Sequence, residues 1–303
     1  MKIALFTSQD VGPDLVEYFR GREDIELMVF TQETARDKIY GYRSTEAACA
    51  RLQVRCLNPN RLDDVFIQTV RGFGPELIVS AYYPKIFPAK LLEIPRLGAV
   101  NVHPGNLPNY RGRFAIPWTI LNGEQQVTVS MHYLDDKVDA GDVLVTASFP
   151  VLPDETGFQL YLRAMHEAGK LLMASFDDLI SGRLKGVPQI GYGSYFTHLE
   201  PRCHVIWQND GRSIERQVRV HAKPYLPAFC YLLNHCFYIN RATFSQPSGV
   251  SARSVGVIVQ VEQDGRFSVS CSNGVIRVED FDVYPAIDDS SLGEYIRVGA
   301  RFE

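Results

Sequence analysis

The chain has 303 residues and a formal net charge of -4, with 46% hydrophobic and 22% charged residues. These proportions are typical of a globular protein with one or two domains, and no apolar run approaches the roughly 20 residues that a membrane-spanning helix needs. A negative chain lacks the overall basic charge with which nucleic-acid-binding proteins neutralise phosphates. We therefore expect a cytoplasmic protein with no membrane partner, and the charge argues against a nucleic-acid partner.

The six cysteines form no C-x-x-C pair, which is the spacing that zinc sites usually show. The N-terminus has one lysine and a short apolar run before Gln9 and Asp10, whereas a signal peptide needs a longer apolar region. We therefore expect reduced, structural thiols, no metal site and no cleaved leader.

The first half of the chain alternates short apolar runs with segments in which apolar residues recur every three or four positions. This alternation predicts βαβ units and an α/β fold with a Rossmann-like, mainly parallel sheet. The predicted strands cover residues 3–6, 25–30, 54–57, 77–81, 99–102, 127–134 and 143–149, and the predicted helices cover 11–19, 46–52 and 63–70.

A long helix is predicted after the last of these strands, because apolar residues recur at helical spacing from Phe158 to Leu179. Thr156 and Gln159 have the spacing of a capping box, and Gly182 suits the end of the helix. We place the first domain at residues 1–188.

The rest of the chain has a different pattern. Residues 189–204 are rich in turn-forming residues and are predicted to be a linker. Residues 205–303 are predicted to form a small OB-like antiparallel β domain, with tight turns at Asp264-Gly265 and Asn273-Gly274. The predicted elements of this domain are a helix over 213–220 and strands over 229–239, 255–262, 267–271 and 275–278.

The loop after the first strand does not match a dinucleotide site. Such sites carry G-x-G-x-x-G, whose glycines admit the pyrophosphate. Residues 7–13 read TSQDVGP, with a single glycine, and Asp10 would repel a phosphate. We therefore do not expect NAD or FAD.

The most informative segment is residues 101–113, NVHPGNLPNYRGR. It begins at the carboxyl end of a predicted strand, where open α/β sheets bind their ligands. Asn101 and His103 are two positions apart in the strand, so their side chains project to the same side. A later strand leads into residues 135–142, DDKVDAGD, which can bring the carboxylate of Asp139 to the first loop. Each residue alone has an ordinary structural explanation, and the prediction of a site depends on their joint appearance.

Residues 101–113 and 135–142 resemble the signature of the folate-dependent formyltransferases, an N-x-H-x-S-x-L-P-x-Y-R-G loop followed by D-x-G. The similarity extends over nearly the whole chain and includes the second domain of the two-domain members. Gly105 replaces the usual serine of the loop, and Asn106 replaces a leucine or lysine.

The resemblance implies that Asn101, His103 and Asp139 are the catalytic residues and that 10-formyltetrahydrofolate is the co-substrate. Asn101 would donate to the oxyanion that forms when an amine attacks the formyl carbon. His103 would donate there or relay a proton, and Asp139 would orient the imidazole or move the proton through a water. The sequence leaves open which residue is the base.

The resemblance also implies a folate pocket, in which main-chain groups meet the pterin. His132 lies near a family position that approaches the folate or the amine. The residues implied to bind folate are Lys85, Ile86, Phe87, Arg113, Asp135, Asp136, Lys137 and Val138.

The acceptor amine separates the branches of the family. Tyr40-Gly41-Tyr42 and the 80–83 strand end look most similar to enzymes that act on nucleotide-linked amino sugars, such as UDP-4-amino-4-deoxyarabinose. Residues 191–303 carry 11 Lys plus Arg and 12 Asp plus Glu, a net charge of -1, which favours a sugar nucleotide over RNA. A methionyl-tRNA formyltransferase is the alternative, a hydroxyornithine formyltransferase the third, and a member that only binds folate or a partner the non-enzymatic hypothesis. The identity of the sugar and of its nucleotide stays open, and a homodimer is a further expectation.

Overall fold

The computed structural model of the chain describes residues 1–197, 203–246 and 254–303. It divides the chain into two compact units. The first comprises Met1–Ile116, Gln126–Pro150 and Tyr161–Thr197, and the second comprises Pro117–Gln125, Val151–Leu160 and His198–Glu303.

The first unit contains a seven-stranded sheet in the order β3-β2-β1-β4-β5-β7-β8. Strands β1 to β5 are parallel, and β7 and β8 are antiparallel to their neighbours, so the sheet is mainly parallel as predicted. The strands are β1 (Lys2–Thr7), β2 (Glu26–Phe30), β3 (Arg55–Leu57), β4 (Leu77–Ala81), β5 (Ala99–His103), β7 (Gln126–Tyr133) and β8 (Val143–Pro150).

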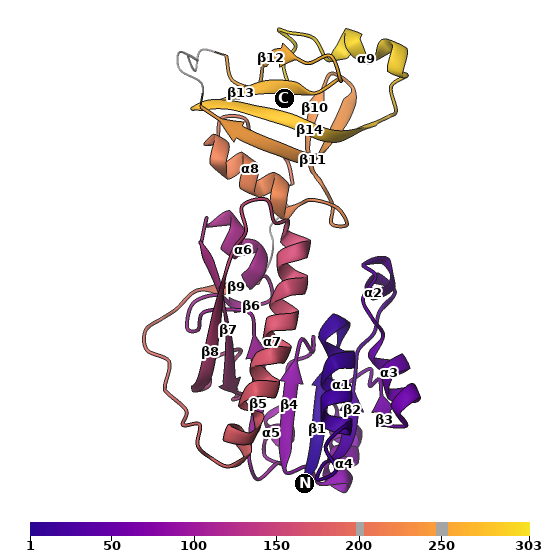
Figure 1. The fold of residues 1–303 in the computed structure, drawn as a ribbon, viewed down its shortest axis with the longest axis vertical. Coiled ribbons are helices and arrows are strands. Elements are labelled where there is room, and N and C mark those ends of the chain that lie inside the picture. The colour runs from indigo at the N-terminus through magenta and orange to yellow at the C-terminus, as the bar shows by residue number, and fades with distance from the viewer. Residues whose placement is uncertain (198–202, 247–253) are drawn as a thin grey trace. The chain divides into compact units, whose positions relative to one another are not determined.

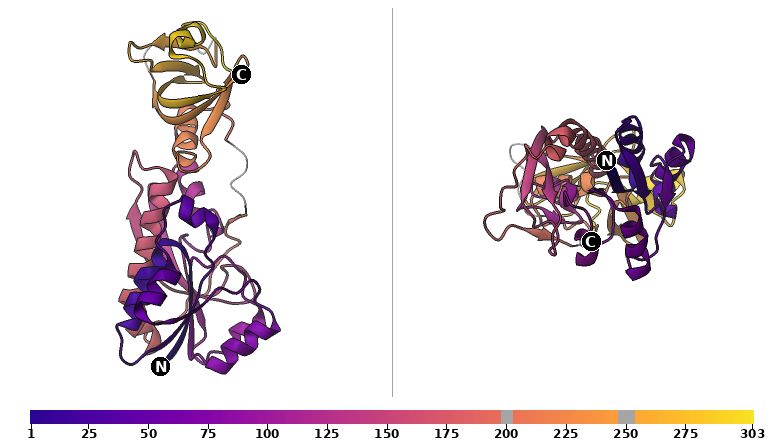
Figure 2. Two further views of the ribbon diagram at one scale, coloured as in Figure 1. Left: turned by 90° about the vertical axis from the view of Figure 1, so that its right-hand side faces the viewer. Right: turned by 90° about the horizontal axis from the view of Figure 1, so that it is seen from below.

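The central strands are apolar throughout because both faces of the sheet are covered. In β1, Ile3 and Leu5 belong to the core cluster under α1, α3 and α7, whereas Ala4 and Phe6 belong to the cluster under α4 and α5. The helices therefore form a layer on each face (Figure 1; Figure 2). The helices of this unit are η1 (Gln9–Val11), α1 (Gly12–Arg20), α2 (Ala35–Ile39), α3 (Thr45–Leu52), α4 (Asp64–Phe73) and α5 (Ala89–Leu92). The residues of α6 (Ala115–Leu121) and of α7 (Gly157–Ile180) are divided between the two units.

The boundaries of α7 confirm the prediction from its caps. The main-chain N–H of Thr156 donates to Gln159 Oε1 (3.0 Å), and the N–H of Gln159 donates to Thr156 Oγ1 (3.2 Å). At the other end Gly182 has φ +71°, a conformation that glycine adopts without steric cost.

The second unit contains a five-stranded antiparallel sheet in the order β10-β11-β14-β13-β12, with α8 (Gly211–Val220) packed against it. Its core includes Trp207, Ile214, Phe237 and Phe267, all nearly inaccessible to solvent. The remaining elements of the second unit are β10 (Ala228–Leu232), β11 (His235–Ser245), β12 (Ile258–Val261), β13 (Phe267–Cys271), β14 (Gly274–Tyr284) and α9 (Asp289–Tyr295). The first unit also contains a short parallel pair, β6 (Arg111–Gly112) with β9 (Tyr195–Phe196).

One predicted strand is two strands. The apolar run 229–239 is interrupted by a turn at Leu233 and Asn234, and β10 pairs back onto β11 with Leu232 opposite His235. Leu233 has φ +53° and is 71% exposed, which is unfavourable for a leucine on both counts. In the hairpin of β13 and β14 the turn residues are Ser272 and Asn273, one position earlier than predicted. Within the described part of the chain, no helix is both long and apolar enough to cross a membrane.

Candidate active site

The predicted catalytic side chains meet at the carboxyl end of β5, the fifth strand in the order of the large sheet. β5 pairs in parallel with β4 on one side and antiparallel with β7 on the other, which places Asn101 opposite His132. The Asn101 Nδ2 group lies 3.3 Å from His132 Nε2. His103 is 5% exposed and His132 is fully buried, so both imidazoles are held away from bulk water.

Asp139 reaches this strand from the loop after β7. Its Oδ2 atom lies 3.6 Å from His103 Nδ1, and its Oδ1 atom lies 3.6 Å from His132 Nε2. The main-chain N–H of Gly112 donates to Oδ2 at 2.9 Å. The carboxylate therefore lies between two imidazoles and accepts a hydrogen bond from the first loop.

The partners of the other ring nitrogens fix the tautomers. His103 Nε2 lies 2.7 Å from the carbonyl oxygen of Tyr110, and His132 Nδ1 lies 2.7 Å from the carbonyl oxygen of Tyr133. A carbonyl only accepts, so each of these nitrogens carries the hydrogen. In the neutral rings the unprotonated nitrogens, Nδ1 of His103 and Nε2 of His132, then face Asp139. A further proton can therefore bind between the carboxylate and either of these two nitrogens.

Burial and neighbouring charges shift the pKa values of His103 and Asp139 in opposite directions. Burial lowers the pKa of His103 below its ordinary value, although the Asp139 carboxylate opposes this effect. Burial tends to raise the pKa of Asp139, but the nearby imidazoles and the N–H of Gly112 outweigh it and hold that pKa well below its usual range. Asp139 is thus ionised at neutral pH, and a proton that enters the cluster is stabilised by its charge.

His132 is the functional candidate that sequence reasoning left outside the catalytic set. It is an inward residue of β7, seven positions before Asp139. The signal that could have found it is cross-strand pairing, because β7 lies beside β5 and His132 is paired with Asn101. This pairing depends on which strands are neighbours, and the sequence pattern does not contain that information.

The segment predicted to contact folate follows β4. Lys85 Nζ donates to the carbonyl oxygen of Asn60 at 2.8 Å and also to that of Pro59, so its charge is directed away from this segment's own peptide groups. The Phe87 side chain is buried and packs on Phe6, with ring centroids 4.8 Å apart, whereas Ile86 is 76% exposed. The peptide groups of residues 85–87 make no hydrogen bond with any other described residue, so they are available to a ligand.

The other predicted folate residues lie on the two loops that are predicted to carry the catalytic residues. Arg113 and the run Asp136-Lys137 are exposed, and Val138 is half-buried. The Asp135 carboxylate accepts from the main-chain N–H of Lys137 at 2.9 Å and shapes the turn that leads to Asp139. Among the described residues, no three His, Cys, Asp or Glu side chains are grouped so that they could hold a metal ion.

Comparison with known families agrees with this geometry. The profile of the family described as "Formyl transferase" matches residues 18–175, and that of "Formyl transferase, C-terminal domain" matches residues 200–283. The chain is 32% identical over 231 residues to the methionyl-tRNA formyltransferase of Pelobacter propionicus, which covers 75% of this chain and 70% of that protein. It is also 32% identical over 230 residues to the methionyl-tRNA formyltransferase of Myxococcus xanthus, with 73% and 70% covered.

Solved structures show the same fold. An N-formyltransferase from Helicobacter canadensis in complex with folinic acid and dTDP-3-aminofucose matches with a TM-score of 0.70 at 16% identity, covering 92% of this chain and 99% of that one. A methionyl-tRNA formyltransferase from Clostridium thermocellum matches with a TM-score of 0.58 at 16% identity, covering 92% and 100%. The profiles and the sequence relatives confirm the resemblance carried by the two loops. The chain belongs to the formyl transferase family and is a folate-dependent N-formyltransferase.

Proposed function

We propose that the chain moves the formyl group of 10-formyltetrahydrofolate onto a primary amine, with Asn101, His103 and Asp139 as the catalytic residues. The observation that carries the proposal is the position of the Asp139 carboxylate, 3.6 Å from Nδ1 of His103 and 3.6 Å from Nε2 of His132. His132 joins the set, because it contacts both Asn101 and Asp139.

The reaction forms a bond from the amine nitrogen to the formyl carbon and breaks the bond from that carbon to N10 of the folate. Attack places negative charge on the formyl oxygen. Asn101 has a second amide hydrogen besides the one directed at His132, and this hydrogen stabilises the oxyanion. In an enclosed, weakly polar site such a donor is worth far more than in water.

One proton must leave the amine, and one must reach N10 of the departing folate. The cluster of Asp139 and the two imidazoles takes up the first proton, because it presents two unprotonated nitrogens to a carboxylate. The same proton then returns to N10. The enzyme therefore ends the cycle in its starting protonation state, and the proton balance closes without another base.

The formyl donor, 10-formyltetrahydrofolate, fits the unpaired peptide groups of residues 85–87. A pterin ring presents amide-like donors and acceptors along one edge. The peptide groups of residues 85–87 have no partner among the described residues and can pair with such an edge. Ile86, Arg113 and the run Asp135 to Val138 supply the rest of the predicted folate contacts.

For the acceptor we propose a small nucleotide-linked amino sugar. The segment after β2 is short, and one of its basic side chains is engaged: the guanidinium of Arg43 donates to the carboxylates of Asp10 and Asp14 at 2.7–3.2 Å. A cavity of about 410 Å³ adjoins this segment. Its lining includes the neutral side chains of Gln9 and Tyr42, the basic Lys38 and Arg43, and the acidic Glu33, Asp37 and Glu46. Its volume is in the range of small-molecule sites, which is roughly 300–1,000 Å³.

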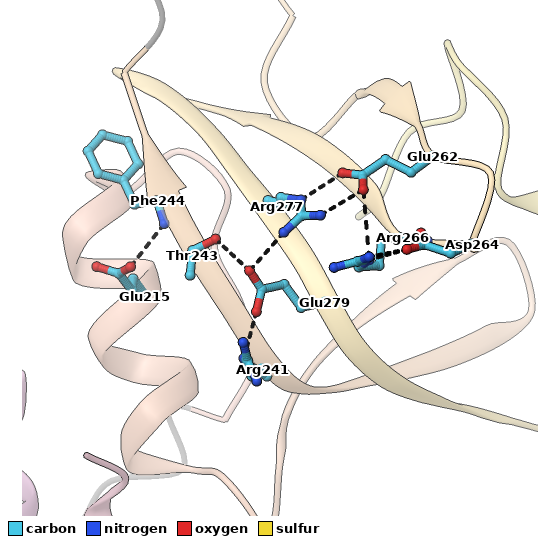
Figure 3. A network of polar contacts seen from close by, with 9 residues as sticks. All are labelled: Glu215, Arg241, Thr243, Phe244, Glu262, Asp264, Arg266, Arg277 and Glu279. Carbon is cyan, nitrogen blue, oxygen red and sulfur yellow. Dashed lines mark hydrogen bonds and ion pairs between the residues drawn. The ribbon is translucent and has the colours of Figure 1, made fainter. Parts of the chain in front are cut away.

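The charges of the second unit also favour a small acceptor. Figure 3 shows arginines of its sheet joined to carboxylates of the same sheet. Arg277 contacts Glu262 (2.6 and 2.7 Å) and Glu279 (3.1 Å), and Arg241 contacts Glu279 at 2.6 Å. Arginines that are paired in this way gain less from binding a phosphate, because the existing ion pair must first be broken.

Methionyl-tRNA is the second candidate acceptor, and the sequence relatives favour it, since the methionyl-tRNA formyltransferases of Pelobacter propionicus and Myxococcus xanthus are each 32% identical to this chain. Helix α8 carries Arg212, Arg216 and Arg219 at helical spacing, which would form a basic stripe suited to a phosphate backbone.

The test is a direct comparison of formyl acceptors at increasing salt. A sugar-nucleotide substrate predicts formylation that depends only moderately on salt. Charged initiator tRNA held by six or more phosphates would lose roughly a thousandfold or more in affinity between about 50 and 200 mM salt. Efficient, salt-sensitive formylation of tRNA, lost when Arg212 and Arg216 become Glu, would establish the second candidate. Formylation of neither class would refute both acceptors.

A further inference from the structure

Residues 187–197 contact both catalytic loops, and we call this segment the strap. Val187 and Val143 exchange two main-chain hydrogen bonds (2.8 and 2.9 Å), which joins the strap to the start of β8. The N–H of Arg111 donates to the carbonyl oxygen of Ser194 at 3.0 Å, and the N–H of Arg113 donates to that of Phe196 at 2.9 Å. The predicted linker covers residues 189–204. Its first part, residues 189–197, therefore belongs to the structure around the site.

Gln189 connects the two loops through one carboxamide. Its Nε2 group donates to the carbonyl oxygens of Asp139 (3.0 Å) and Gly141 (2.7 Å). Its Oε1 atom accepts from Arg111 Nε (3.1 Å) and Nη2 (2.6 Å). All the hydrogen-bonding capacity of the side chain is used.

The backbone that Gln189 holds is an unfavourable one. Asp139 has φ +52°, and an L-residue in this region persists only when its surroundings fix it. Gly141 is pressed against the carbonyl oxygen of Tyr133, where a Cβ would lie 2.0 Å away. Among the described residues, no main-chain N–H donates to the carbonyl oxygens of Asp139 and Gly141. The conformation that directs the carboxylate at the imidazoles is therefore held by Gln189, together with the N–H of Gly112 that donates to Asp139 Oδ2.

We propose that Gln189 is a positioning residue for the formyl transfer: its carboxamide holds the Asp139 loop in register with the Arg111 loop, so that the Asp139 carboxylate lies between His103 and His132. This inference rests on the proposed function, in which Asp139 is catalytic. It concerns the geometry of the transition state, and it predicts an effect on turnover more than on folate binding.

Two substitutions separate the two halves of the carboxamide. Gln189→Leu removes all four hydrogen bonds. Gln189→Glu keeps an acceptor for Arg111 but cannot donate to the loop carbonyls. If positioning Asp139 is the role, both variants should lower kcat by on the order of tenfold to a hundredfold, with KM for the folate changed by less than about threefold. Ile190→Ala, at an 87% exposed neighbour on the strap, is the matched control and should keep full activity.

The deciding measurement is a double-mutant cycle with Asp139→Asn. In that background Gln189→Leu should cost little more, because the residue acts through Asp139 and its effect is already lost. Equal losses in both backgrounds would overturn the positioning role in favour of general destabilisation. An active Gln189→Glu variant would also overturn it and would assign the effect to Arg111. If Asp139→Asn alone remains fully active, the proposed function has failed. An inactive Asp139→Asn variant beside a fully active Gln189→Leu variant would refute the positioning role alone.

Discussion

Replacing Asp139 with asparagine removes one charge and changes almost nothing else in shape. The carboxylate lies 3.6 Å from an unprotonated nitrogen of each imidazole, in a position that is 9% exposed. At that distance and an effective dielectric constant of about 20, a carboxylate stabilises a protonated imidazole by roughly 4–5 kcal/mol. If the transition state carries the proton of the amine in this cluster, Asp139→Asn should lower kcat by on the order of a thousandfold.

The assay is steady-state turnover with 10-formyltetrahydrofolate, combined with a separate measurement of folate affinity. Folate binding should change far less than kcat, because the lost interaction forms mainly in the transition state. Adding His103→Asn to Asp139→Asn should cost little beyond the worse single variant, because the two residues share one proton. Asp142→Asn, three positions along the same loop, is the control and should remain largely active. A loss below about tenfold in Asp139→Asn, or a larger loss in Asp142→Asn, would refute the reasoning.

Three other predictions concern the Asp139 loop, two buried histidines and the turn at Leu233. Gly141→Ala should lower turnover by on the order of a hundredfold without unfolding the protein, because its Cβ would displace the Asp139 loop; Gly72→Ala, where a Cβ meets no atom within 4 Å, should be fully active. Stability should fall as the pH drops below about 6.5, since burial lowers the pKa of both His103 and His221 and the unfolded chain then binds more protons. Denaturant unfolding at two pH values measures the change in unfolding free energy. If that change is the same in the variant with both histidines replaced by asparagine, the reasoning is contradicted. Leu233→Gly should raise the unfolding free energy by about 0.5–1 kcal/mol, because glycine adopts φ +53° without steric cost and the site is exposed. An unfolding free energy below that of the unmodified chain would contradict that reasoning.

Local signals made much of the fold predictable. β1, β2 and β4 are short apolar runs buried on both faces, and the capping box of Thr156 with Gln159 fixes where α7 begins. The meeting of the candidate catalytic residues was also predictable, because Asn101 and His103 share one side of a strand and Asp139 follows a nearby strand. The bounds 1–188, 189–204 and 205–303 and the homodimer remain predictions.

Features that depend on distant contacts were not predictable. Gln189 lies 50 residues after Asp139, and only the folded chain brings its carboxamide to that loop. His132 became a site residue through its pairing with Asn101 across two strands. The turn at Leu233 contradicts the preferences of turn residues, because the pairing of β10 with β11 overrides them. Residues 198–202, part of the predicted linker, lie outside the described residues.

The central claim is that this chain transfers a formyl group from folate to an amine through Asp139. The most direct measurement uses 10-formyltetrahydrofolate with an isotopically labelled formyl group, and follows the label by mass spectrometry in the presence of amino-sugar nucleotides or methionyl-tRNA. We predict that the label moves to the amine of one acceptor with the wild-type chain and that transfer is slowed by on the order of a thousandfold in Asp139→Asn. A label that stays on the folate with every acceptor, or that is transferred equally fast by Asp139→Asn, would contradict the account.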